Sequence, residues 1–195
     1  MTFVYFASGN ENKFLEIQNL LEMENKENKE NIKILFLSPA IKEIQSDSII
    51  EVAEDKAKKA FSSIKRPVIV EDDGLFIEEL NGFPGVYSSF AFKTIGNKGI
   101  LNLLANNEKR RAHFLSVFSF FDGNTIETFC GETAGHIATG IFPSGWGFDP
   151  IFRPENEDLT YGKLNIQRKN EISHRSKAFR RFLRWYKLKY NHHNN

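Results

Sequence analysis

Short apolar runs alternate with helical patterns through the first third of the chain, and this alternation limits the fold more than any other feature. Residues 3–7, 32–37 and 67–70 are apolar enough to be buried strands. Residues 11–23 and 49–64 carry apolar side chains at helical spacing. Strands separated by helices favour parallel pairing with helices on the sheet, so the pattern predicts an α/β fold.

The middle of the chain adds an antiparallel part. Ala112–Phe121 is apolar at successive positions, which is typical of a central strand covered on both faces. A turn signal at Asp122–Asn124 predicts a hairpin to a strand at 125–130, and another strand is expected at 133–138. The sheet should therefore be mixed, with flanking helices that include a short one at 97–105.

Size and composition fit one globular domain spanning residues 1–195. The net charge is +1, which gives the whole molecule no strong attraction to nucleic acid or to a membrane surface. The N-terminus lacks a secretory signal pattern, and no apolar run reaches the roughly 18 residues needed to span a bilayer.

The chain has a single cysteine, Cys130, which cannot form an intramolecular disulfide. This favours a reducing compartment, and we expect a cytoplasmic protein. A catalytic thiol is the alternative function for Cys130, but its place in a strand-like run favours an inert position in the sheet.

Ser8-Gly9-Asn10-Glu11-Asn12-Lys13 follows the first apolar run and begins the first helical pattern. Backbone N–H groups and the helix dipole at such a junction attract anions, and Lys13 adds a positive charge. The segment is a candidate phosphate cradle, and an ordinary capped turn is the alternative.

Three adjacent carboxylates, Glu71, Asp72 and Asp73, follow the apolar run at 67–70. The carboxyl end of a strand is where ligands usually bind in α/β proteins. Like charges this close repel one another, and a divalent cation such as Mg²⁺ relieves the repulsion. An acidic turn is the alternative interpretation.

Two loops contain glycines and aromatic side chains. Gly145-Trp146-Gly147-Phe148-Asp149 combines rings with a carboxylate, a set suited to a purine base that stacks and donates from its edge. A buried aromatic loop is the alternative. The segment 80–89 is expected to be a rigid loop.

Ser173, His174 and Arg175 lie near the start of a basic C-terminal helix predicted at about 171–189. Ser173 can cap the helix, and the planar fork of Arg175 suits a carbonyl or phosphate oxygen. The basic residues raise nucleic-acid binding as an alternative, but Phe179 and Phe182 recur at helical spacing, so one face of this helix should pack on the core.

Taken together, these segments resemble the inosine triphosphate pyrophosphatase family, and archaeal-type members in particular. The likeness runs from about residue 3 to about residue 189. Each motif alone is weak, but five in order are specific. They are SGNENKFLE (8–16), VEDDGL (70–75), LNGFPGVYS (80–88), GWGFDPIF (145–152) and SHR (173–175).

The resemblance implies an elongated, curved mixed sheet with two lobes and an active-site cleft between them. It also implies a homodimer that uses Mg²⁺, with Mn²⁺ as a substitute, to convert ITP, dITP and XTP to the monophosphate and pyrophosphate. Hydrolysis of other modified nucleoside triphosphates is the alternative activity.

The resemblance also implies roles for individual residues. Asp72 is the catalytic carboxylate, Glu43 and Asp72 hold the metal ion, and Glu16 and Glu71 support the site. The residues implied to bind substrate are Ser8, Gly9, Asn10, Lys13, Asp73, Trp146, Gly147, Phe148, Asp149, Lys169, His174 and Arg175.

Two positions depart from the family pattern. Asp73 stands where a small hydroxyl residue is usual, which should raise the dependence on metal unless the side chain points away. Arg168 stands where an acidic residue often precedes the lysine, so Lys169 lacks its usual neighbour. We expect Arg175 and Lys169 to donate to the 6-oxo group of the base and to disfavour adenine, which has an amino group there.

Overall fold

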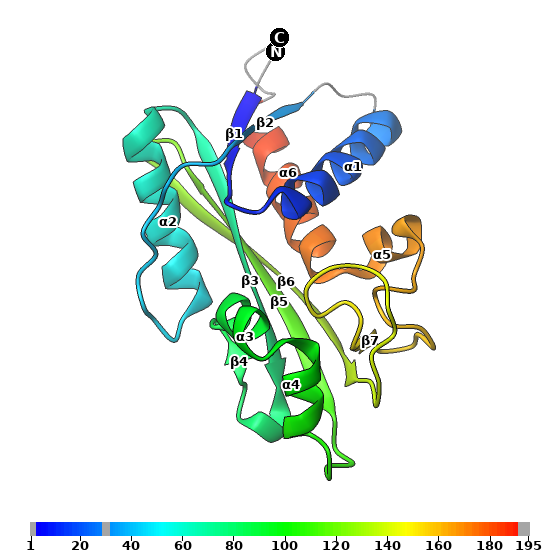
Figure 1. Cartoon of the computed structure of the whole chain (residues 1–195). Coiled ribbons are helices and arrows are strands. Elements are labelled where there is room, and N and C mark those ends of the chain that lie inside the picture. The colour runs from blue at the N-terminus through cyan, green and yellow to red at the C-terminus, as the bar shows by residue number, and fades with distance from the viewer. Residues whose placement is uncertain (1–2, 29–31, 191–195) are drawn as a thin grey trace. The chain divides into compact units, whose positions relative to one another are not determined.

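The computed structural model of the chain describes residues 3–28 and 32–190 (Figure 1). Its helices are α1 (Glu11–Asn28), α2 (Ile49–Ile64), the short 3₁₀ helix η1 (Glu78–Leu80), α3 (Ser88–Thr94), α4 (Gly96–Leu103), α5 (Ile166–Ile172) and α6 (His174–Tyr190). Its strands are β1 (Phe3–Ala7), β2 (Lys33–Leu37), β3 (Val68–Ile77), β4 (Pro84–Gly85), β5 (Arg111–Phe121), β6 (Ile126–Ile137) and β7 (Phe152–Pro154).

The strands form one mixed sheet in the part of the chain that the structure describes, with the order β2-β1-β3-β5-β6-β7 and with β4 paired to β3. β1 runs parallel to both β2 and β3, and the register places Ala7 beside Val70. β4 and β7 are antiparallel to β3 and β6. The predicted α/β fold with a mixed sheet is confirmed.

The chain divides into two compact units. Unit 1 comprises Met1–Asp72, Val117–Cys130 and Ser176–Asn195, and unit 2 comprises Asp73–Ser116 and Gly131–Arg175. β3, β5, β6 and α6 each contribute residues to both units, and β3 changes unit between Asp72 and Asp73. That residues 1–195 form one domain stays a prediction.

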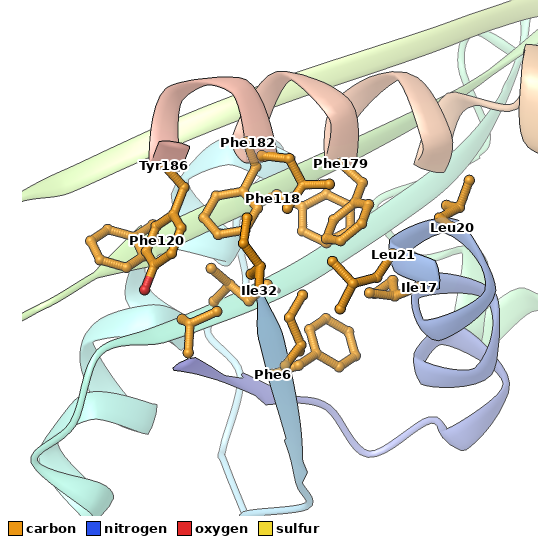
Figure 2. Close-up of a cluster of buried hydrophobic side chains, with 14 of the residues drawn as sticks. Phe6, Ile17, Leu20, Leu21, Ile32, Phe118, Phe120, Phe179, Phe182 and Tyr186 are labelled. Carbon is orange, nitrogen blue, oxygen red and sulfur yellow. The ribbon is translucent and has the colours of Figure 1, made fainter. Parts of the chain in front are cut away.

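The core of unit 1 is built from aromatic side chains of β5 and α6, together with aliphatic side chains of α1. Phe118 lies 5.6 Å from Phe179, between ring centroids, and Phe120 lies 6.3 Å from Phe182. Figure 2 shows Ile17 and Leu21 of α1 reaching the same cluster. The prediction that the basic C-terminal helix packs one face on the core is confirmed.

Both faces of the C-terminal part of β5 are covered by helices. Successive side chains of a strand point to opposite faces, so two neighbouring residues report on the two sides. Phe120 contacts α6, while the next residue, Phe121, packs edge-to-face on Phe61 of α2 at 5.1 Å. The prediction of a central strand covered on both faces is therefore confirmed for this part of β5.

Unit 2 has its own core. Buried residues from β3, α4, β5 and β7 meet there with Phe148 and Tyr161. Phe114 of β5 stacks on His174 at 4.5 Å and packs edge-to-face on Phe152 at 4.7 Å. This core includes side chains from the segments that carry the sequence motifs.

Two predicted strand boundaries are wrong for reasons of packing. β3 continues through the carboxylates to Ile77 because Leu75 and Ile77 are buried, and Gly74 lets β4 approach. A side chain at Gly74 would lie 2.5 Å from the carbonyl oxygen of Gly85. The two strands predicted at 125–130 and 133–138 are one strand, β6, in which Gly131 does not break the pairing.

Two helix predictions and one loop prediction also differ from the structure. The predicted C-terminal helix is two helices, because Ser173 is extended, with φ −70° and ψ 151°, between α5 and α6. α1 continues to Asn28 through a polar tract, of which residues 29–31 lie outside the described part. The rigid loop predicted at 80–89 contains β4 and the start of α3.

Cys130 lies in β6 and is partly exposed. Burial raises the pKa of its thiol, against the opposing effect of Arg181, so the thiol stays protonated at neutral pH. Its position in the sheet matches the expectation of an inert cysteine. Among the described helices, none is both long and apolar enough to cross a membrane.

The packing of α6 predicts different effects for two leucines of the same helix. Leu183→Ala should lower the free energy of unfolding by about 2–5 kcal/mol, because Leu183 is 1% exposed. Leu188→Ala should change it by less than about 0.5 kcal/mol, because Leu188 is 63% exposed. Denaturant unfolding of both variants measures the difference, and equal losses would contradict the docked face.

Candidate active site

The junction between β1 and α1 has the hydrogen bonds of a capped turn. Ser8 Oγ accepts from the N–H of Asn10 at 3.1 Å, and Asn10 Oδ1 accepts from the N–H of Asn12 at 3.0 Å. A Cβ on Gly9 would meet nothing within 4 Å. The capped-turn interpretation thus accounts for the local geometry, and phosphate binding at Ser8, Gly9 and Asn10 stays a prediction.

Lys13 is buried on α1 and faces strand β3. Its Nζ lies 3.2 Å from Oε2 of Glu71, whose side chain is completely buried. Glu16 lies about one helical turn after Lys13 and is half-buried. The structure therefore brings together Lys13, which was predicted to bind the triphosphate, and Glu71, which was predicted to support the site.

Lys56 of α2 joins the two carboxylates predicted to hold a metal ion. Its Nζ lies 2.6 Å from Glu43 Oε1 and 3.6 Å from Asp72 Oδ2. Glu43 comes from the irregular segment between β2 and α2 and is half-exposed, whereas Asp72 is mostly buried.

The sequence analysis missed Lys56, although a signal was present. Lys56 falls on the apolar face of α2, between Val52 and Ala53 on one side and Ala57 and Ala60 on the other, all of which are buried. A lysine on the buried face of an amphipathic helix needs a carboxylate partner.

Arg175 lies next to two other predicted site residues of unit 2, Asp73 and Trp146. Its Nη2 donates to Asp73 Oδ2 at 2.7 Å, and only 2% of the Arg175 side chain is exposed. The guanidinium carbon lies 5.1 Å from the centroid of the Trp146 ring, a cation–π arrangement. His174 Nε2 lies 3.7 Å from the same oxygen of Asp73.

Lys169 forms a second buried ion pair in the same unit. Its Nζ lies 2.6 Å from Asp149 Oδ2, and both side chains are more than nine-tenths buried. The same Nζ lies 5.9 Å from the Trp146 ring and 5.5 Å from the Tyr161 ring. Asp149 thus provides Lys169 with a carboxylate, while Arg168 turns to Glu157 and Glu171.

A glycine at position 145 is required by this arrangement. Gly145 has φ +80°, which favours glycine, and a Cβ there would lie 2.9 Å from Oδ2 of Asp149. Larger residues would therefore collide with the carboxylate that pairs with Lys169.

Phe148 does not form an exposed aromatic wall. It is buried in the core of unit 2, and its ring packs edge-to-face on Phe92 at 5.4 Å. The alternative of a buried aromatic loop fits this residue, because its ring packs among the buried side chains of unit 2. Trp146 stays partly exposed, and the carbonyl of Gly147 accepts from Asn97 Nδ2 at 3.1 Å.

Tyr161 is a further buried residue that the sequence analysis missed. Its ring lies 5.0 Å from that of Phe152 and 6.0 Å from that of His174. Burial, more than any other cause, raises the pKa of Tyr161 well above its usual value. The phenol is therefore neutral at physiological pH, and it adds no charge beside Lys169.

The charged residues of the two units differ in what they can bind. Lys13 and Lys56 are compact cations suited to phosphate oxygens, whereas Arg175 offers a planar fork beside an aromatic ring. Among the described residues, no group of three histidine, cysteine or acidic side chains is arranged to hold a metal ion by itself.

A comparison with protein families matches residues 4–185 to the Ham1 family. The chain belongs to the Ham1 family. The resemblance inferred from the five motifs is thereby confirmed.

Curated relatives of this Ham1 protein include two named dITP/XTP pyrophosphatase. The one from Methanopyrus kandleri is 46% identical over 94% of this chain and 96% of its own length. The one from Pyrococcus horikoshii is 38% identical over 95% of this chain and 97% of its own length. A solved Ham1 protein from Coxiella burnetii superposes with a TM-score of 0.82 at 29% identity, covering 96% of this chain and all of that chain.

The buried pair between Lys13 and Glu71 predicts an unequal effect of single and double substitutions. Lys13→Met should cost about 3 kcal/mol of unfolding free energy, because it removes the cation 3.2 Å from a buried carboxylate. Adding Glu71→Gln should recover most of that loss, since the buried negative charge is then gone as well.

Lys59→Met is the matched control, because the ion pair between Lys59 and Asp55 is partly exposed on α2. It should cost less than about 1 kcal/mol. Denaturant unfolding provides all three values, and a double variant that is no more stable than Lys13→Met alone would contradict the pairing.

Proposed function

We propose that this Ham1 protein hydrolyses non-standard purine nucleoside triphosphates, namely ITP, dITP and XTP, to the monophosphate and pyrophosphate. The protein is then a hydrolase of the bond between the α- and β-phosphates. One observation carries the proposal: adjacent residues of β3 belong to two clusters that suit different parts of a nucleotide. Asp72 lies beside Lys56, and Asp73 binds Arg175.

The cluster in unit 1 suits the triphosphate. Lys13 and Lys56 supply positive charge at fixed positions, and electrostatic stabilisation of this kind is the main source of catalysis in phosphoryl transfer. Ser8, Gly9 and Asn10 are the residues proposed to bind phosphate at the start of α1, where helix N–H groups and the helix dipole attract anions. Each lysine lies beside a carboxylate that fixes its position, so its positive charge is already placed for the phosphates.

Asp72 is the proposed catalytic residue. Its carboxylate orients a water molecule whose oxygen forms a bond to phosphorus, and it accepts a proton as the anhydride bond breaks and pyrophosphate leaves. Its ion pair with Lys56 holds the carboxylate in place.

Mg²⁺ is part of the proposal, with Mn²⁺ as a substitute. The donor set fits, because Glu43 and Asp72 offer two carboxylates to one cation, now Lys56, and Mg²⁺ usually takes one or two carboxylates together with substrate phosphates. When bound, the ion would supply neutralisation of phosphate charge. Glu71, beside Lys13, supports this end of the site.

The cluster in unit 2 suits a 6-oxopurine. Trp146 offers a face for stacking, and Arg175 and Lys169 offer donors to the 6-oxo oxygen, while His174 lies beside Arg175. Adenine has an amino donor at the same place, so it would turn a donor toward these cations instead of an acceptor, which disfavours it strongly. Asp149 holds Lys169 for this role.

Other modified nucleoside triphosphates are the second candidate substrates, and a substrate panel separates them from ITP. Nucleic-acid binding is less favoured, because three basic residues of α6 already contact other residues of unit 1. Arg180 pairs with Glu24, Arg181 donates to the carbonyl of Cys130, and Lys189 donates to Thr125.

The proposal includes a homodimer, and light scattering tests this oligomeric state. It also includes a cytoplasmic location, because the nucleotide pool is in the cytoplasm.

The reaction and its catalytic residue make one prediction. The wild-type protein with Mg²⁺ should release pyrophosphate from ITP, and Asp72→Asn should lower kcat about 10²- to 10⁴-fold, because the amide cannot accept a proton. Asp47→Asn, an exposed carboxylate in the same unit, should leave kcat unchanged. Pyrophosphate and orthophosphate are assayed separately, and orthophosphate as the first product would refute the proposal.

The base-reading role of Arg175 makes a second prediction. Arg175→Ala should lower kcat/KM for ITP about 10- to 100-fold, since a charged hydrogen bond contributes about 1.5–3 kcal/mol. The residual hydrolysis of ATP should fall much less. Arg175→Lys keeps the positive charge but loses the planar fork. It should therefore also lower the efficiency for ITP more than that for ATP, while disturbing the buried ion pair with Asp73 less than Arg175→Ala does. Equal losses for ITP and ATP would place Arg175 at the phosphates or in a structural role.

A further inference from the structure

The carboxylate of Asp73 is hydrogen-bonded to Arg175, the residue proposed to bind the edge of the base. The side chain of Asp73 is 17% exposed, and its Oδ2 accepts from Arg175 Nη2 at 2.7 Å. Charge-assisted hydrogen bonds of this length are strong and hold both partners in one geometry. Any group that meets Arg175 therefore also meets the negative charge of Asp73.

The ion pairs of this cluster are balanced. The positive charge of Arg175 lies against Asp73, and that of Lys169 lies against Asp149. His174 Nε2 also lies 3.7 Å from Oδ2 of Asp73. Each of these two cations has a carboxylate beside it. The cluster therefore offers hydrogen-bond donors at fixed positions, but little excess positive charge.

The two bases of the proposed substrates differ in charge. Hypoxanthine is neutral near neutral pH. Xanthine carries a second carbonyl group, which makes a neighbouring ring N–H acidic, so a large part of XTP has an anionic base at the same pH. Both bases present a 6-oxo acceptor, so donors alone cannot separate them, whereas the charge of the site can.

We propose that Asp73 is a specificity residue that makes this protein prefer the neutral hypoxanthine base over the anionic xanthine base. The inference rests on the proposed function, and in particular on Arg175 meeting the base. A carboxylate within a few ångströms of the base edge repels an anionic ring, and in a partly buried site this repulsion is large enough for about a tenfold effect or more. A neutral base does not experience it.

Asp73→Asn tests the charge with little change in shape. The amide oxygen of asparagine can still accept from Arg175, but the negative charge is gone. Asp73→Ser removes both the charge and most of the side chain. Asp158→Asn is the matched control, because Asp158 is an exposed carboxylate of the same unit.

The measurements are kcat/KM for ITP and for XTP near neutral pH, and calorimetric Kd values for IMP and XMP, with the melting temperature of each variant. The ratio of XTP to ITP efficiency should rise about tenfold or more in Asp73→Asn and in Asp73→Ser. The affinity for XMP relative to IMP should rise in the same direction. Asp158→Asn should leave both ratios at the wild-type values.

A ratio that stays within about twofold in both Asp73 variants would overturn the inference, whatever happens to the absolute rates. The same holds if Asp73→Ser loses activity equally on both substrates and Asp73→Asn restores it, since Asp73 would then only position Arg175. These outcomes differ from a failure of the proposed function, in which the wild-type protein would release no pyrophosphate from either substrate.

Discussion

A charged side chain can be buried in this fold because an opposite charge lies beside it, and the proposed site depends on this pairing. Lys13, Lys56, Lys169 and Arg175 are all at least nine-tenths buried, and each lies within 4 Å of a carboxylate. An isolated buried cation would cost far more free energy than the fold could supply. Pairing also fixes the direction of each cation, so the charges are positioned before a ligand binds.

Strand β3 supplies three of these carboxylates in succession. Alternation along a strand sends neighbouring side chains to opposite faces, so Glu71, Asp72 and Asp73 cannot all meet the same cation. Glu71 pairs with α1, Asp72 with α2 and Asp73 with the start of α6. A run of acidic residues that would repel one another in a turn is therefore distributed over three partners in a strand.

The sequence allowed the elements with a strong period to be predicted. α2 and β2 lie close to where the apolar pattern placed them, and the mixed sheet followed from helices between early strands and a hairpin signal later. The errors came where tertiary contacts override local signals. The predicted strands stopped before Gly131 and before the carboxylates, but pairing with neighbouring strands carries β6 and β3 through them.

The resemblance to the family named the charged residues of the proposed site except Lys56, but not the pairs that they form. Nothing in the local sequence says that Asp73 meets Arg175, which is more than a hundred residues away, or that Asp149 rather than position 168 provides the partner of Lys169. Lys56 had a signal, a lysine among buried alanines on one helix face, and was missed because the segment matched no motif. Phe148 was misplaced because its sequence neighbours do not reveal which aromatic side chain turns inward.

The central claim is that the unit 1 cluster binds the phosphates and the unit 2 cluster binds the base. NMR titrations with separate pieces of the substrate test this claim most directly. Pyrophosphate with Mg²⁺ should shift the amide signals of residues 8–13, Glu71 and Asp72, whereas inosine, which has no phosphate, should shift those of Trp146, Lys169 and Arg175. The reverse pattern, or inosine and pyrophosphate shifting the same signals, would contradict the account.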